Sequence, residues 1–170
     1  VDAIHDGDAP RHHAALFIGS ITLAAAAPAW WLRRVELQQL ALFGATIVTS
    51  LGVLDTIADG RDSVLSPLAA GLVLVALGAI WVAVGLADRL PPALLANVSG
   101  SALVLIGAQV VRADSDHAGL WLGLVASITL MATGVARSEL EIMFVWTAGL
   151  FQWTPQIALF YLEDTLGTEA

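Results

Sequence analysis

Apolar residues in this chain fall into six runs of roughly twenty residues, separated by short polar stretches. As a helix, each run has about the length that crosses the ~30 Å hydrocarbon core of a bilayer. Short connections force neighbouring helices to lie antiparallel. The pattern predicts an all-α protein, a polytopic transmembrane helix bundle with six antiparallel spans. The six runs are 14–32, 40–57, 64–87, 90–111, 118–136 and 142–162.

The domain organisation follows from these runs. No linker or shift in composition divides them, so 14–162 is predicted to be one six-span domain. A polar tail with acidic residues and histidines precedes it at 1–13. The stretch 163–170 is interpreted as a second polar tail or as the start of a further segment.

Composition supports the membrane interpretation. Hydrophobic residues make up 58% of the 170, charged residues 13%, and the mean hydropathy is +0.80. A soluble domain of this size needs a charged surface that these residues cannot supply. We therefore expect the lipid bilayer of the cell (plasma) membrane as the main partner. The formal charge of −8 argues against nucleic acid as a partner.

The first run has a second interpretation. The stretch "RHHAALFIGSITLAAAAPAW" has the basic entry, apolar core and small-residue exit of a signal peptide. However, acidic residues precede it, and the hydrophobicity continues through Trp31 and Leu32. These two features favour a membrane span.

Arginines in alternate connections give a weak orientation signal. One side of the predicted bundle carries three arginines and eleven acids, and the other carries four arginines and four acids. The positive-inside rule places the side with four arginines in the cytoplasm, with both termini outside. The four arginines are Arg33, Arg34, Arg89 and Arg137.

The cytoplasmic turns also resemble one another. "LRRVELQQLALFG", "ADRLPPALLANVSG" and "ARSELEIMFVWTAG" each run from an arginine through polar or proline residues and an apolar stretch to a glycine. This similarity suggests three tandem helical hairpins. The alternative is that any helix pair joined by a short turn produces such a pattern.

Small residues mark the faces on which the helices pack. Burying leucine against leucine gains little in lipid, so association depends on close backbone approach. Gly71, Gly78 and Gly85 recur every seven residues, which places them on one side of a helix. Gly119 and Gly123 form a GxxxG pair. This pair is predicted to pack either on another helix of the chain or on a second copy.

The stretch "FQWTPQIALF" interrupts the last run with polar residues and a proline. Pro155 cannot donate a backbone hydrogen bond, so a kink is expected there. Gln152 and Gln156 are four residues apart and share a face. In one interpretation, the amides bond across helices and to the loosened backbone. In the other, they belong to a polar pocket that holds a small ligand, formed by Asn97, Gln109, Gln152, Trp153 and Gln156.

Catalytic and metal-binding patterns are missing from the sequence. There is no cysteine, no HExxH motif and no histidine in an apolar run. The stretch "DAIHDGDAPRHH" could chelate a divalent metal, but a flexible tail gives no fixed geometry. No run has an ionisable residue at its centre, which argues against ion-coupled transport. We therefore expect no enzyme activity, no metal and no cofactor.

Two stretches, "AAGLVLVALGAIWVAVGLADRLPPALLANVSGSALVLIGAQVV" and "VARSELEIMFVWTAGLFQWTPQIALF", resemble multi-spanning prokaryotic membrane proteins of unknown function built from tandem helix hairpins. The resemblance implies a fold style and no activity. The favoured function is a structural or accessory membrane protein, or a module of a larger assembly with other subunits or with itself. The alternative is an uncoupled permease or channel for a small solute.

Overall fold

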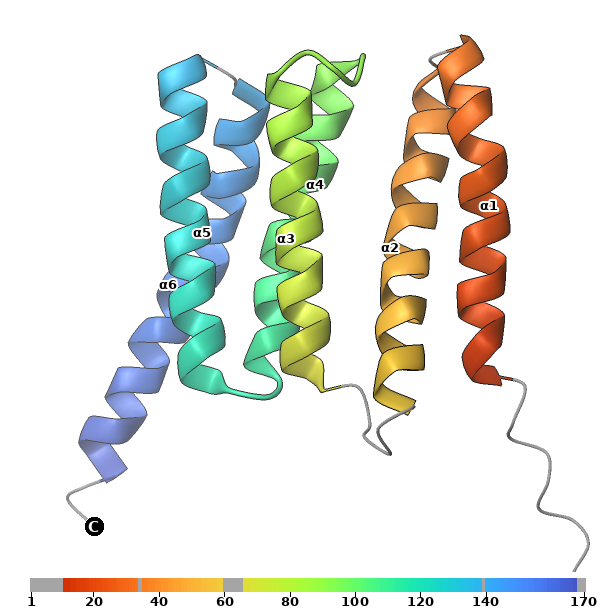
Figure 1. The fold of residues 1–170 in the computed structure, drawn as a ribbon. Helices are drawn as coiled ribbons and strands as arrows, with labels where there is room; N and C mark the ends of the chain where they lie inside the picture. The colour runs from red at the N-terminus through yellow and green to blue at the C-terminus, as the bar shows by residue number, and fades with distance from the viewer. Residues whose placement is uncertain (1–10, 34, 60–65, 139, 168–170) are drawn as a thin grey trace, which may run out of the picture. The chain divides into compact units, whose positions relative to one another are not determined.

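The computed structural model describes residues 11–33, 35–59, 66–138 and 140–167, and over these ranges the protein is all-helical, with no strand (Figure 1). The predicted all-α helical bundle is confirmed. The helices are α1 (Arg11–Arg33), α2 (Glu36–Asp59), α3 (Pro67–Leu86), α4 (Ala93–Arg112), α5 (Asp116–Arg137) and α6 (Leu140–Gly167).

Four helices, α2 to α5, are long and apolar enough to cross a membrane. Within α1, Leu16–Leu32 forms a shorter apolar helix. Helix α1 begins at Arg11 and α6 ends at Gly167, so helix extends into both stretches predicted as polar tails. The remainder of those tails, 1–10 and 168–170, lies outside the described residues.

The chain divides into two compact units, residues 1–66 and 67–170. Unit 1 is the antiparallel hairpin of α1 and α2. Its helices approach closely where a glycine on one faces the backbone of the other. A Cβ atom on Gly19 would lie 2.8 Å from the backbone nitrogen of Thr49, and one on Gly52 would lie 2.8 Å from that of Leu16. No side chain larger than hydrogen fits at either position.

Unit 2 contains α3 to α6, with α4 as its most buried helix. Helix α4 packs against α3, α5 and α6, and α5 also packs against α6. Residues of α4 are buried over most of its length. Helix α4 begins after Pro91 and Pro92, which cannot donate the backbone hydrogen bonds of a helix interior. Because of this central place, Asn97 and Ser101 of α4 are buried.

Capping residues begin or end several helices of unit 2. Asp88 follows α3 with a φ of 53°, and Ser138 follows α5 with a φ of 56°. Both adopt the left-handed conformation that commonly ends a helix. The hydroxyl of Ser115 accepts a hydrogen bond from the backbone N–H of Ala118 at the start of α5. These caps allow the short connections that hold the helices antiparallel.

A glycine seam joins α3 to α4. A Cβ atom on Gly78 would lie 2.6 Å from the carbonyl oxygen of Gly100, and one on Gly71 would lie 2.7 Å from that of Gly107. Gly100 and Gly107 are themselves seven residues apart, like the glycines that face them. The two backbones therefore meet at matched levels of an antiparallel pair, with the seven-residue period of left-handed packing.

Candidate functional site

The five residues of the predicted polar pocket lie on two helices of unit 2. Asn97 and Gln109 are on α4, and Gln152, Trp153 and Gln156 are on α6. Asn97 and Trp153 are buried, Gln109 and Gln156 are half-buried, and Gln152 is exposed. Asn97 and Gln109 are twelve residues apart on one helix, about 18 Å along its axis. The structure therefore distributes these side chains over several levels of the bundle.

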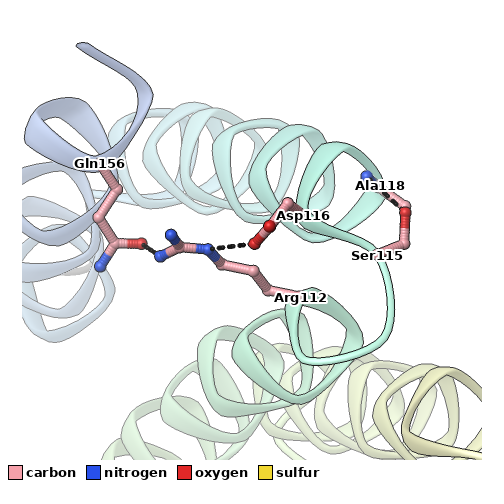
Figure 2. A network of polar contacts seen from close by, with 5 residues as sticks. All are labelled: Arg112, Ser115, Asp116, Ala118 and Gln156. Carbon is pink, nitrogen blue, oxygen red and sulfur yellow. Dashed lines mark hydrogen bonds and ion pairs between the residues drawn. The ribbon is translucent and has the colours of Figure 1, made fainter. Parts of the chain in front are cut away.

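Arg112 makes the main polar contact between helices of unit 2. Its Nη1 donates a hydrogen bond to Oε1 of Gln156, and its Nε donates to Oδ1 of Asp116 over 3.2 Å (Figure 2). One guanidinium thus ties the end of α4 to the start of α5 and to α6. Arg112 lies one residue beyond the predicted run 90–111, and no sequence pattern links it to Gln156, which lies 44 residues further along the chain.

Gln152 and Gln156 offer a matched test of this contact. Replacing Gln156 by leucine leaves the half-buried Arg112 without a side-chain acceptor on α6. We expect the free energy of unfolding to fall by about 1.5–3 kcal/mol, the usual worth of a hydrogen bond to a charged group. Gln152→Leu changes an exposed side chain and is expected to have no measurable effect. Thermal unfolding of both variants in the same detergent measures the difference, and equal stabilities would contradict the expected result.

Asn97 lies at the end of the glycine seam. Its Oδ1 is 2.5 Å from the position that a Cβ atom would take on Gly85. The missing side chain at Gly85 therefore makes room for the amide of Asn97, whereas at Gly71 and Gly78 it makes room for the backbone of α4. Asn97 is 1% exposed and Ser101, one turn later, is 0% exposed. Within the described residues, neither Asn97's amide atoms nor Ser101's hydroxyl has a hydrogen-bond partner, so both donors and acceptors are left open inside the bundle.

Trp153 is a structural anchor of α6. It is 0% exposed and forms a core cluster with Leu105, Ala108 and Leu120. Its ring covers Gly123, where the atoms nearest to an added Cβ would all belong to the indole. The second glycine of the GxxxG pair thus packs inside the chain. The other, Gly119, faces the backbone of Arg112.

The registers of α4 and α6 place Gln109 beside the level of Trp153. Leu105 packs at Gly149, and Arg112 bonds to Gln156, so the same offset of 44 residues relates both pairs. Gln109 and Trp153 have this offset too. The Nε2 of Gln109 and the Nε1 of Trp153 are both buried, and in the described part of the chain neither has an acceptor. The amide nitrogen of Gln109 and the indole nitrogen of Trp153 thus lie at one level of α4 and α6 without a hydrogen-bond acceptor.

Four cavities among the described residues of unit 2 lie elsewhere. One of about 550 Å³ runs along α6 beside Pro155, and another of about 360 Å³ runs between α3 and α5. A third, of about 580 Å³, lies against the first half of α6 and Val98, and a fourth, of about 10 Å³, lies beside His117. None of these four cavities is lined by Asn97 or by a glutamine.

Within the ranges that the structure describes, no group of three histidine or acidic residues could hold a metal ion. The stretch 1–10, which holds one histidine and three acids of the tail considered above, lies outside these ranges.

Comparisons of the chain with models of protein families, with curated proteins and with solved structures found no match.

Proposed function

We propose that this chain is a non-enzymatic integral membrane protein that serves as a structural or accessory module of a larger membrane assembly. The observation that carries the proposal is the use of polar side chains in unit 2. Arg112 and Gln156 join helices, and Asn97 is enclosed against Gly85. The bond between Arg112 and Gln156 stabilises a helix contact, and the amide of Asn97 fills the space beside Gly85.

The outer surface supports a role in assembly. Large apolar side chains are exposed in both units, including Trp31 at 73%, Phe144 at 78% and Phe151 at 80%. In α2, only 11% of the most apolar window is buried. Such surfaces suit lipid, and they also suit helices of another subunit or of a second copy.

Native gel electrophoresis tests the assembly. The tagged chain, solubilised from its own membrane at its natural level, is expected to migrate well above its 17.7 kDa monomer plus micelle. The same chain expressed alone in a foreign membrane separates self-association, which keeps the larger size, from association with other subunits, which loses it. Migration as a monomer from the native membrane would refute the proposed role.

A small-solute permease is the second candidate, because Asn97 and Ser101 keep open donors and acceptors inside the bundle. Vesicles that contain the protein would then swell faster in urea or glycerol than empty vesicles. The double variant Asn97→Leu, Ser101→Ala would abolish the increase. Equal swelling of loaded and empty vesicles would eliminate this candidate.

We further propose a multi-pass plasma-membrane topology with the Arg89 and Arg137 turns in the cytoplasm and both termini outside. The natural chain has no cysteine, so single cysteines can be labelled selectively. In intact cells, a membrane-impermeant maleimide is expected to label Asp114→Cys, but to label Asp88→Cys and Ser138→Cys only after lysis. The reverse pattern would invert the topology.

A further inference from the structure

A long apolar groove runs between α3 and α5. Helix α3 contributes residues from Val75 to Leu86, helix α5 contributes residues from Leu122 to Thr133, and Val104 of α4 also lines it. Eleven residue steps of helix correspond to about 16 Å. This is close to half of the ~30 Å hydrocarbon core, the depth of one lipid leaflet.

The size of the groove selects a slender occupant. Its volume of about 360 Å³, spread over that length, corresponds to a cross-section of roughly 22 Å². A helix 10–12 Å across needs a cross-section of roughly 80–110 Å². The groove therefore has room for a single extended chain along its length.

The chemistry of the lining selects an apolar chain. The two hydroxyl groups in the groove already donate within α5, from Thr129 to the carbonyl of Val125 and from Thr133 to that of Thr129, each over 2.8 Å. The other lining residues are alanine, valine and leucine. No donor remains for a polar ligand, whereas a hydrocarbon chain needs none.

Two arginines lie beyond the same end of the groove. Arg89 follows the last lining residue of α3 by three positions, and Arg137 follows that of α5 by four. The turn after α3 and the connection after α5 lie at one end of unit 2 (Figure 1). Both arginines are exposed, and in the described ranges neither guanidinium group takes part in a hydrogen bond or ion pair. Their guanidinium groups are therefore available to a ligand.

We infer that this end of unit 2 binds one phospholipid, with an acyl chain in the α3–α5 groove and the phosphate on Arg89 and Arg137. A planar guanidinium pairs well with phosphate oxygens. Asp88 lies beside Arg89, and Glu139 and Glu141 follow Arg137 in the sequence. Three acids thus accompany the two arginines, so the phosphate is recognised by hydrogen-bonding geometry rather than by a positive field.

Native mass spectrometry of the full chain in detergent tests the phosphate contact. Phosphatidylglycerol and diacylglycerol with identical acyl chains are added separately, because only the first carries a phosphate. We expect one phosphatidylglycerol to be retained per chain in preference to diacylglycerol. The double variant Arg89→Gln, Arg137→Gln is expected to lose affinity for phosphatidylglycerol on the order of tenfold or more. Arg112→Gln removes a charge at the other end of the unit together with the contacts to Asp116 and Gln156, and the folded fraction of this variant should retain the lipid.

A second pair of variants tests the groove. Ala83→Leu with Ala126→Leu fills it and is expected to abolish retention of the lipid although both arginines remain. Ala76→Leu adds one leucine at an exposed position of α3 outside the groove and should leave retention unchanged. Size-exclusion profiles and helical circular dichroism verify that every variant is folded.

Three results would overturn the inference. The wild-type chain could retain no lipid, it could retain diacylglycerol as well as phosphatidylglycerol, or the filled groove could still hold the lipid. Each result removes a different part: the site, the phosphate contact or the acyl-chain position.

Discussion

Replacing Gly78 by alanine is expected to destabilise unit 2 strongly. The new Cβ atom would lie 2.6 Å from the carbonyl oxygen of Gly100 and 2.8 Å from the backbone nitrogen of Val104. Backbone atoms cannot rotate away as a side chain can, so the helices must separate. Overpacking of this kind costs about 1–3 kcal/mol, and separation also removes close contacts along the seam. Thermal unfolding in detergent, followed by circular dichroism, measures the loss.

Gly44→Ala is the matched control for this substitution. No heavy atom lies within 4 Å of the position where its Cβ would be built. Alanine is favoured over glycine in a helix by about 1 kcal/mol, so this variant should be as stable as the natural chain or more so. If Gly78→Ala unfolded at the same temperature as Gly44→Ala, the seam would not be the basis of the α3–α4 contact.

Removing the indole of Trp153 is the second substitution with a large expected effect. The side chain is 0% exposed and packs on Gly123, so alanine leaves a large void between α5 and α6. Buried Trp→Ala changes usually cost about 3–5 kcal/mol. We expect roughly 3 kcal/mol, the low end, because hydrophobic transfer contributes little when the surroundings are lipid. Trp121→Ala, at a side chain 55% exposed, should change stability little.

A double-mutant cycle identifies the partner of Trp153. Gly123→Ala alone should be strongly destabilising, because its methyl group would overlap the indole ring. In the Trp153→Ala background, the same methyl group enters the space that the ring has vacated. The two costs should therefore be far from additive. Additive costs would mean that the ring and the glycine do not interact.

Much of the helical architecture could be predicted from the sequence, since long apolar runs leave few alternatives in a bilayer. The pattern of Gly71, Gly78 and Gly85 identified one side of α3. The matching glycines of α4, Gly100 and Gly107, were missed although they show the same seven-residue spacing. Comparing the glycine spacing of neighbouring runs would have revealed the pair.

The polar contacts were less predictable, because they depend on which helices become neighbours. The bond from Arg112 to Gln156 requires α4 and α6 to lie in parallel contact, and nothing local in the sequence specifies that. Gln152 and Gln156 differ by about 40° around the helix, since four residues at about 100° each exceed one full turn. The two amides therefore lie near the edge of the buried face, where Gln156 is half-buried and Gln152 is exposed. The boundary between the two units, near 66, has no compositional signal.

The glycine seam and the contact of Trp153 with Gly123 also differ in when they can form during synthesis. Both sides of the seam are present once the chain has been made to Val111, so α3 and α4 can pair as a hairpin at once, with contacts close in sequence. Gly123 stays uncovered until α6 has been synthesised, because Trp153 follows that glycine by thirty residues. A chain truncated before Trp153 would then keep its α3–α4 pair but expose an unfilled face of α5, where quality-control proteases can distinguish unfinished molecules from complete ones.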